Sequence, residues 1–594
     1  MNKTTYVYIN MKIFLIFIFF PAVFSWSAKI VDNHGGDSAD FNDIGLALTF
    51  LQAGDTLLVR GDTEIRRAYN TQSAQLSLIN SGTESQPIVV AAWPNEKVEI
   101  RLPSGGLDFN GSYWILENLV FDAGSVQGSN LIFLERTAEH CVIRNCEVYH
   151  GTSSGRDGID SRSDHLLIEK VKIHSLAPEG SGDHHGIVLV RGRNIIIRGC
   201  EIYDVHGDGI QLQGSRATLN EVLIENNHIY VTEDFNTRME NAIDVKECSS
   251  VVISNNRIHG FRRSYDSDGT AINVHFNASD ISIEKNEFYD CQIAIRVNDG
   301  TYGVPERVKI HRNTIHDLLK TDDWDTEFLS GIGIKLDGAR DVTITHNTIS
   351  NVNHHIMITS DSSGGPAPWL YSQVGIVLAK PPPGWVDGGY WGNFAGVENM
   401  TIVNNLFHKC SNRTIPIEEG AWGKVLVENN GYFDISSECE LTDTDMVVSG
   451  LDPDFLQNLT TPFSLNSSSP AINAGKDLGE PDMQGLPDLG AFEFGVPGFI
   501  SSDVKWNKDT DIQIWPNPFK KHLNLSIENE NEKMILVEIY DIQGRLVKSF
   551  PLKSIGYTLA WNGKNMIGKS VVKGSYYIRV KFNKQQLIRK IIRN

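Results

Sequence analysis

A motif of eight residues recurs along the middle of the chain and restricts the folds open to it. It begins as VIRNCEVY at 142–149 and ends as TIVNNLFH at 401–408, with seven related copies between them. Each copy alternates apolar and polar residues, which predicts a short β-strand. One such strand per coil cannot bury its apolar side alone, so the copies must stack on one another. The repeat therefore predicts an all-β, right-handed parallel β-helix.

An asparagine occupies the same place in most of these copies. In a stacked fold these side chains form an internal ladder whose amides bridge successive backbone turns. Cys146 and Cys200 hold the equivalent position in two earlier copies, which predicts buried thiols. We interpret the position as structural. Its asparagines are Asn227, Asn256, Asn286, Asn313, Asn347 and Asn405.

The segments around the repeat predict how the β-helix begins and ends. An amphipathic helix over 40–53 can cap its open end, and GDTLLVRG at 54–61 supplies a first strand. The coils fade after Asn430, and 451–494 resembles the closing segment of bacterial β-helix proteins. We predict that the β-helix domain spans residues 29–494.

Residues 1–28 predict export. Their apolar run of about ten residues is too short to cross a bilayer and ends in small residues, as in a signal peptide. Later stretches are too polar for a membrane span. The net charge of −20 argues against nucleic acid or an anionic membrane as a partner. It permits an anionic sugar if the binding site is locally basic.

The composition changes after residue 494. A linker over 495–510 precedes an all-β segment, 511–594, which carries WPNPF, YDIQGRLV and GSYYIRV. These motifs and the basic tail closely resemble the C-terminal sorting domain of the type IX secretion system. The resemblance implies that the secretion machinery is a partner, and that the protein is secreted or attached to the cell surface.

A second strand in each coil predicts an outward face on which chemistry can lie. Inward Ile, Val and Leu alternate there with outward residues that stack in two columns, about 4.8 Å apart from coil to coil. The first column is Asp160, Val188, Gln211, Asp244, Asn273, Arg296, Lys335 and Met357. The second is Arg162, Val190, Gln213, Lys246, His275, Asn298, Asp337 and Thr359.

The middle of this face combines a lysine, a histidine, acids and arginines, the groups that acid–base chemistry on a charged sugar requires. We predict cleavage of an acidic polysaccharide by β-elimination, with Lys246 as the base because cationic neighbours lower its pKa. His275 would be the acid or charge stabiliser. The other substrate-contacting residues would be Arg262, Arg263, Arg296, Asn273 and Lys335, with an arginine or calcium neutralising the uronate.

The stretches MENAIDVKECS and GTAINVHFN resemble the chondroitinase B and alginate lyase group, polysaccharide lyase family six. The resemblance implies that Lys246 matches the base of that group. His275 stands where the group has an arginine, so this chain departs from the pattern. Calcium ligands precede the lysine strand in the group, and Asp208, Glu240 and Asp244 are the candidates here.

Three other interpretations stay open. The face can be a plain hydrophilic strand surface. The chain can be a glycoside hydrolase that uses Asp160, Asp208 or Asp244, or a surface adhesin that binds glycan without cleaving it. The acids and histidines around 157–160, 183–185 and 204–208 can serve such a site, or they can satisfy the backbone of the turns.

Overall fold

The described part of the chain forms two compact units, residues 1–451 and 452–594. The computed structural model describes residues 28–34, 39–64, 66–71, 73–152, 156–176, 183–233, 235, 239–262, 269–298, 303–318, 331–358, 376–378, 397–410, 425–435, 453–455, 463–479, 486–494, 510–515, 520–529, 535–541, 546–552, 558–565, 569–581 and 586–593. The predicted signal peptide lies outside these ranges except for Ala28. The predicted domain boundaries remain predictions.

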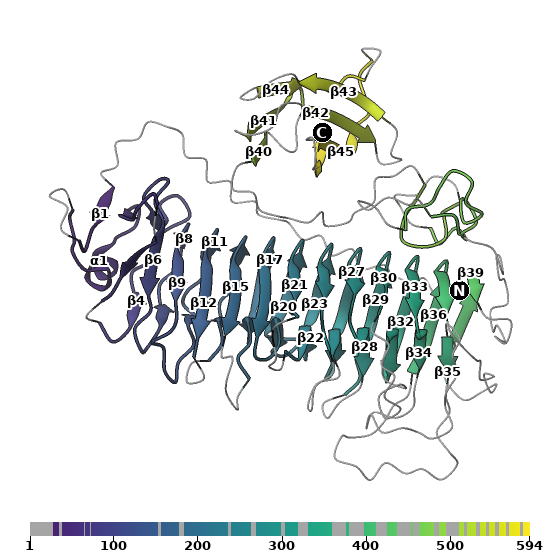
Figure 1. The fold of residues 1–594 in the computed structure, drawn as a ribbon, viewed down its shortest axis with the longest axis horizontal. Helices are drawn as coiled ribbons and strands as arrows, with labels where there is room; N and C mark the ends of the chain where they lie inside the picture. The colour runs from purple at the N-terminus through teal and green to yellow at the C-terminus, as the bar shows by residue number, and fades with distance from the viewer. Residues whose placement is uncertain are drawn as a thin grey trace, which may run out of the picture. The chain divides into compact units, whose positions relative to one another are not determined.

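Three parallel sheets wind through the first unit as a right-handed β-helix, which confirms the predicted fold (Figure 1). The first sheet orders β1 (Lys29–Val31), β2 (Thr56–Val59), β5 (Ile88–Ala92), β8 (Trp114–Glu117), β11 (Val142–Arg144), β14 (Leu167–Glu169), β17 (Gly192–Arg198), β20 (Leu219–Glu225), β23 (Ser249–Ser254), β26 (Ser279–Glu284), β29 (Glu306–His311), β32 (Ala339–Thr345), β36 (Val397–Val403) and β38 (Val425–Glu428).

The other two sheets repeat the same stacking. The second orders β35 (Ile376–Leu378), β34 (His354–Ile358), β31 (Ile332–Asp337), β28 (Ile293–Asn298), β25 (Thr270–His275), β22 (Asn241–Lys246), β19 (Ile210–Gln213), β16 (Ile187–Leu189), β13 (Ile159–Ser161), β10 (Ile132–Leu134), β7 (Leu107–Phe109) and β4 (Leu76–Leu78). The third orders β3 (Arg67–Tyr69), β6 (Val98–Arg101), β9 (Val120–Asp122), β12 (Glu147–Gly151), β15 (Lys172–Leu176), β18 (Glu201–Val205), β21 (His228–Tyr230), β24 (Arg257–His259), β27 (Glu287–Tyr289), β30 (Thr314–His316), β33 (Thr348–Val352), β37 (Leu406–Cys410) and β39 (Gly431–Ile435).

The eight-residue motif spans two strands, so the prediction of one strand per copy is wrong. VIRNCEVY contributes to β11 and then to β12, which belong to different sheets. Asn145 lies between them with a φ of 51°, and this left-handed conformation turns the chain through a corner. Residues at the same corner of other coils also have positive φ: Lys170, Asn226, Asn255, Lys285, Arg312, His346, Asn404 and Asn429.

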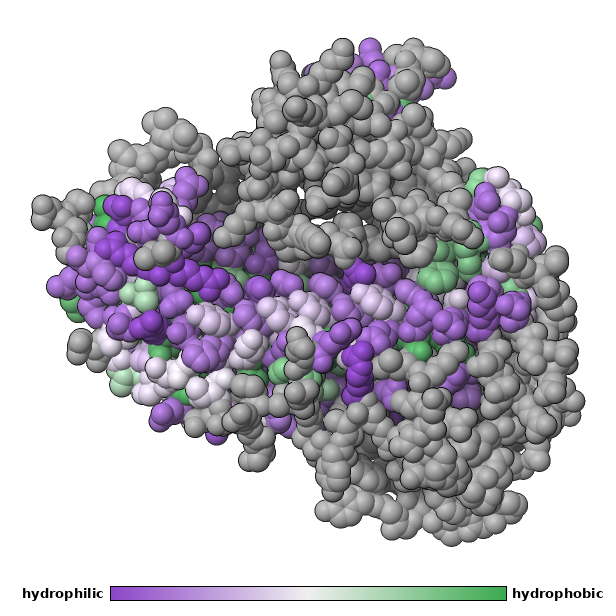
Figure 2. All heavy atoms as spheres, viewed as in Figure 1, coloured by the Kyte–Doolittle hydropathy of each residue, from purple (hydrophilic) through white to green (hydrophobic). Residues whose placement is uncertain are grey.

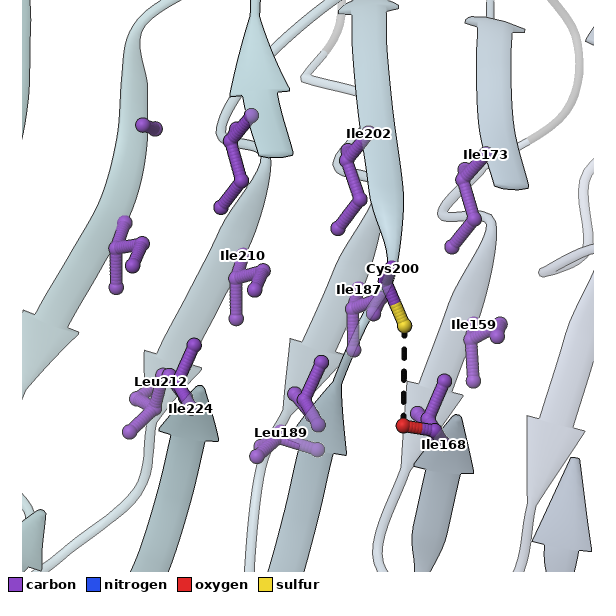
Figure 3. Packing of buried hydrophobic residues seen from close by; sticks show 14 of the residues in the cluster. Ile159, Ile168, Ile173, Ile187, Leu189, Cys200, Ile202, Ile210, Leu212 and Ile224 are labelled. Carbon is purple, nitrogen blue, oxygen red and sulfur yellow. Dashed lines mark hydrogen bonds between the residues drawn. The ribbon is translucent and has the colours of Figure 1, made fainter. Parts of the chain in front are cut away.

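Columns of apolar side chains fill the interior of the coils. Ile159, Ile187 and Ile210 are paired in register on successive strands of the second sheet, and all three are fully buried. Figure 3 shows this column facing a second one that contains Ile173 and Ile202. Because each coil buries its side chains against the next, the core runs continuously along the stack.

The predicted asparagine ladder is confirmed. The Asn256 amide nitrogen donates to Asn286 Oδ1 at 2.9 Å and to the Ile224 carbonyl at 3.0 Å, and its Oδ1 accepts from the backbone and side chain of Asn227. The pattern continues through Asn405 to Asn430. At the other end the Cys200 N–H donates to Asn227 Oδ1. Buried amides that satisfy one another in this way hold successive coils in register.

The first coil is covered by one short helix. Among the described residues the predicted cap helix is α1 (Ile44–Phe50), shorter than the segment 40–53 that the sequence indicates. The Asp43 carboxylate accepts from the Leu46 N–H at 2.8 Å and caps the helix N-terminus. Ile44, Ala47 and Leu48 are buried against the coil stack, as a terminal repeat requires.

Five described cysteines are buried free thiols, which confirms the interpretation of Cys146 and Cys200. Cys200 Sγ donates to the Ile168 carbonyl at 3.7 Å (Figure 3). Burial raises the pKa of both Cys146 and Cys200 to about 12. The burial of these thiols can be tested by alkylation. Thiolates are the reactive species, so native protein exposed to iodoacetamide at neutral pH should stay unmodified at Cys146 and Cys200, as read by peptide mass spectrometry. Modification at the rate of a denatured sample would contradict this.

The second unit contains two antiparallel sheets, in agreement with the predicted all-β segment. The first orders β40 (Thr510–Trp515), β41 (Leu523–Asn529) and β44 (Thr558–Trp561). The second orders β43 (Leu546–Leu552), β42 (Ile535–Asp541), β45 (Gly574–Lys581) and β46 (Gln586–Arg593). Leu523, Val537 and Ile578 are buried within this unit.

The described surface of the β-helix is mostly hydrophilic on the face drawn in Figure 2. Small apolar areas interrupt it, and isolated apolar side chains are normal on soluble surfaces. No helix within the described ranges is long and apolar enough to cross a membrane.

Candidate functional site

The second sheet carries the candidate residues in the predicted columns. Gln211, Asp244 and Asn273 are paired in register on β19, β22 and β25, and Lys246 is paired with His275. The inward neighbours Ile243 and Val245 belong to the core, so these polar side chains lie on the opposite side of the strands. Further along the same column, Asn273 is followed by Arg296 and Lys335.

This face is not a plain solvated surface. Asp244 and Lys335 are each 2% exposed and His275 is 8% exposed. Charged side chains are rarely buried unless they are paired, because loss of hydration is costly. The burial therefore argues against the interpretation of these columns as an ordinary hydrophilic strand surface.

Asp244 joins the two residues on which the predicted chemistry depends. Its Oδ1 lies 2.7 Å from His275 Nε2, and its Oδ2 lies 2.7 Å from Lys246 Nζ. The aspartate and the lysine are two residues apart on β22, and the histidine is on β25, one coil further. One buried carboxylate thus holds a histidine and a lysine at its two oxygens.

The electrostatics of this group differ from the expectation in one respect. Burial raises the pKa of Asp244, but His275 and Lys246 outweigh it and hold the pKa well below its usual range. Burial lowers the pKa of Lys246, yet Asp244 and Asp208 outweigh it and the pKa is raised. The expected lowering of the lysine pKa is therefore wrong: its close neighbours are anionic, and Lys246 is an ammonium at neutral pH.

His275 is oriented by the same carboxylate. An ionised carboxylate only accepts hydrogen bonds, so the proton in this contact lies on His275 Nε2. Within the described ranges Asp244 is the hydrogen-bond partner of the ring, which stacks on Phe276 with centroids 3.9 Å apart. With Nε2 protonated, Nδ1 of the neutral imidazole keeps a lone pair that can accept a proton.

Beyond Asp244 the column turns from anionic to cationic. Asn273, Arg296 and Lys335 follow it on three successive strands, about 4.8 Å apart. Asn273 Oδ1 is buried and has no hydrogen-bond partner within the described structure. An unpaired buried acceptor costs about 1–3 kcal/mol, so this amide is suited to a ligand that brings a donor such as a sugar hydroxyl.

Asp208 precedes β19 and is held by amides. Its Oδ1 accepts from the Asn241 side chain at 2.8 Å and its Oδ2 from Gln211 Nε2 at 2.8 Å. Burial and the nearby Asp244 raise its pKa. Sequence reasoning missed Asn241, although its position is equivalent to Asp208 one coil later and marks it as the next member of this row.

The acids and histidines in these turns form a second polar ladder. Asp157 Oδ1 accepts from the His185 N–H, His185 Nδ1 accepts from the Asp208 N–H, and Asp208 Oδ1 accepts from the Asn241 N–H. Each side chain therefore satisfies the backbone of the following coil, as the turn interpretation expects for these residues.

The predicted calcium ligands do not fit a metal ion in the observed arrangement. Both oxygens of Asp244 face cationic or N–H groups, and both oxygens of Asp208 accept from amides. Glu240 precedes β22, and its N–H donates to the Gly207 carbonyl. In the described part of the chain no three acidic, histidine or cysteine side chains are grouped to hold a metal.

One of the predicted arginines, Arg262, is bound elsewhere. Arg262 follows β24, and its guanidinium pairs with Asp290 at 2.8 Å and donates to the Gly260 carbonyl. The structure therefore does not bring Arg262 to Asp244. Arg263 lies outside the described residues.

The Asp244 contact permits a test by pH. The pKa of Asp244 is lower in the folded protein than in the unfolded chain, where it is about 3.9. Its pairing therefore stabilises the protein fully at pH values above the unfolded-state pKa. This stabilisation is lost as the pH falls through the folded-state pKa. We expect Asp244→Asn to lower the free energy of unfolding by about 3 kcal/mol near neutrality. The difference in free energy of unfolding between the variant and wild type should shrink toward pH 2, as measured by denaturant titrations. A difference that does not change with pH would contradict the ionised pairing.

Two family models match this chain, one in each of its two units. The model described as "Right handed beta helix region" matches residues 105–235 and 185–367, which contain every strand of the candidate site. Residues 105–367 are a right-handed β-helix region. The model "Secretion system C-terminal sorting domain" matches residues 513–594, so this sorting domain indicates secretion. No curated protein sequence matches the chain.

Solved structures similar to the β-helix region include polysaccharide lyases, all at low identity. Pectate lyase Pel9A is 13% identical over 79% of this chain and 98% of its own, with a TM-score of 0.38. The PL6 family polysaccharide lyase Pedsa3628 from Pseudopedobacter saltans is 13% identical over 72% and 94%, with a TM-score of 0.41. The PL6 family alginate lyase AlyGC is 15% identical over 80% and 58%, with a TM-score of 0.45.

Proposed function

We propose that this protein is an exported enzyme that cleaves an acidic polysaccharide by β-elimination. The observation that carries the proposal is the buried Asp244 carboxylate, bonded at once to His275 and Lys246. Two and three coils further along the same column, Arg296 and Lys335 supply positive charge. A base, a proton donor and cations are the three requirements of elimination from a uronate.

The contacts favour an exchange of the two roles expected from the sequence. His275 Nδ1 takes the proton from C5 of the uronate, because Asp244 keeps the other ring nitrogen protonated. The electron pair forms the C4–C5 double bond as the C4–O bond breaks. The Lys246 ammonium donates a proton to the leaving oxygen. The proton then moves from the imidazolium to solvent and the lysine regains one, which restores both groups.

The cationic residues have a separate task. A uronate carboxylate withdraws electrons from C5 only when its own negative charge is neutralised, and this stabilises the carbanion-like transition state. Arg296 and Lys335 lie one and two coils beyond Asn273, where they can receive the carboxylate. The Asn273 Oδ1 acceptor is suited to a neighbouring sugar hydroxyl.

The spacing of carboxylates disfavours the alternative glycoside hydrolase. Asp160 and Asp244 are separated by three coil steps, through Val188 and Gln211. That is roughly 14 Å at about 4.8 Å per step, whereas hydrolytic pairs are about 5–9.5 Å apart. Asp208 is fully buried and already bonded to two amides.

Calcium remains a proposal for neutralising the substrate carboxylate, although Asp208, Glu240 and Asp244 do not fit it as arranged here. Calcium would act as a Lewis acid there. The cations Arg296 and Lys335 make it dispensable in the proposed reaction. Activity that survives chelation by EDTA supports the role of these side chains. Loss of activity that calcium restores supports a bound ion.

A polymer screen tests the proposal. The purified β-helix-containing protein is mixed with alginate, pectate, glycosaminoglycans and ulvan, and ultraviolet absorbance is followed together with reducing ends. Elimination produces both signals, because the new double bond is conjugated with the carboxylate. Reducing ends without absorbance would establish a hydrolase, and binding without either signal would establish an adhesin.

A further inference from the structure

The face that carries Asp244 continues toward the N-terminus and holds a second group of polar atoms there. Asn130 Nδ2 donates to Asp160 Oδ2 at 2.7 Å. The remaining polar atom of each side chain, Asp160 Oδ1 and Asn130 Oδ1, is buried and has no hydrogen-bond partner within the described structure. Asp160 is 6% exposed. Two unpaired acceptors on a pair of hydrogen-bonded side chains raise the free energy of the folded state. This points to a ligand that donates hydrogen bonds to them.

This second group is acidic, whereas the column beyond Asp244 is cationic. Burial and Asp157 raise the pKa of Asp160 to about 6 even though the nearby Arg162 lowers it, and burial together with Glu135 raises the pKa of Asp108 in a preceding coil. Carboxyl groups raised in this way lie in a dry, acidic neighbourhood. A uronate carboxylate is therefore disfavoured here, whereas Arg296 and Lys335 favour one at the other end of the column.

The neighbours also indicate the chemical class of the ligand. Phe133 on β10 is paired in register with Asp160, and the Arg162 guanidinium lies 5.1 Å from its ring centroid. No three acidic, histidine or cysteine side chains of the described ranges converge to hold a metal. Sugar hydroxyls are uncharged donors that match such acceptors, and an apolar ring beside hydroxyl-binding acceptors is typical of a sugar site.

We propose that Asp160 and Asn130 form a subsite for an uncharged, hydroxyl-bearing sugar, so that the substrate is a heteropolysaccharide in which neutral sugars accompany the uronates. This inference rests on the proposed function and specifies its substrate class. Asp160 lies three coil steps, roughly 14 Å, from Asp244. A chain laid along the column thus places a uronate at His275 and a neutral sugar at Asp160.

The test compares two kinds of polymer. Alginate and polygalacturonate consist of uronates, whereas gellan also contains neutral sugars. Elimination rates and retardation in polymer-containing native gels are measured for wild type, for the Asn130→Ala/Asp160→Ala double variant and for Asp160→Asn. Asp164→Asn serves as the matched control, because it makes the same charge change in the same coil and its carboxylate pairs with Arg193 instead.

We expect wild type to prefer gellan. The double variant should raise KM, or weaken retardation, about tenfold for this polymer with little change in kcat. Asp160→Asn should weaken binding less, since it keeps the shape, and it provides the answer if the double variant does not fold. The control should behave as wild type. Equal or better action on the uronate homopolymers, or unchanged variants, would overturn the subsite.

The outcomes separate this inference from the proposed function. Retardation that the variants lose, without any ultraviolet product, supports the subsite and rejects elimination. Product formation that the variants leave unchanged supports elimination and rejects the subsite. If the protein neither cleaves nor binds any of the three polymers, both the proposed function and the subsite are rejected.

Discussion

Replacing His275 by alanine should reduce the rate of elimination by about 10²–10⁴-fold while leaving KM nearly unchanged. The imidazole is the group that takes the C5 proton, and no other described side chain shares its contact with Asp244 Oδ1. The measurement is the initial rate of ultraviolet absorbance on the polymer that wild type cleaves fastest. Thermal unfolding of the variant, followed in parallel, shows whether it keeps its fold.

Two companion variants sharpen this result. Asp244→Asn should lower kcat strongly and change its pH profile, because the carboxylate that fixes the imidazole tautomer is lost. His150→Ala is the control, since His150 is exposed and bonds Asp122 on another sheet. A His275→Ala variant that retains elimination, together with an inactive Lys246→Ala variant, would return the role of base to Lys246.

Replacing Asn313 by alanine should lower the free energy of unfolding by about 3–5 kcal/mol. The fully buried side chain accepts from the Asn286 backbone and amide at 3.0 Å and donates to the Ile283 carbonyl and to Asn347. Alanine removes these bonds, so the Asn286 N–H loses its acceptor, while Asn347 Oδ1 keeps the N–H of residue 313 and Asn286 Nδ2 keeps the Ile253 carbonyl. Urea titration monitored by circular dichroism measures the change in the first unit.

The chain itself suggests the matched variants. Asn313→Cys should cost less than Asn313→Ala, because cysteine occupies this ladder position at Cys200 and donates to the equivalent carbonyl. Asn220→Ala, on the outward side of β20, should change stability by no more than about 0.5 kcal/mol. Equal stability of Asn313→Ala and wild type would mean that the ladder contributes nothing.

Much of the fold could be predicted because its repeat is regular. Alternation identified the inward residues, and recurrence of Asn227 and Asn256 identified the ladder. The corner within the motif could not be seen, since a left-handed residue such as Asn145 turns the chain without interrupting the apolar pattern. The division of each motif between two sheets was missed for this reason.

The site could be predicted in its composition but not in its electrostatics. Period-two alternation and the coil register placed Asp244, Lys246 and His275 on one face. The sign of the Lys246 pKa shift depends on two carboxylates, and one of them, Asp208, comes from the turn of an earlier coil. Burial of the outward face also depends on the three-dimensional structure, which strand periodicity does not describe.

The asparagine ladder covers only part of the stack, from Cys200 to Asn430. In a quasi-one-dimensional fold, stability is a sum of local coil terms, and folding spreads from whichever coils form first. The ladder coils should therefore nucleate the fold, and the coils before Cys200 should assemble onto them. Native-state hydrogen exchange would reveal this as slower exchange of amides in β20–β36 than in β2–β11, with unzipping that begins at the helix-capped end.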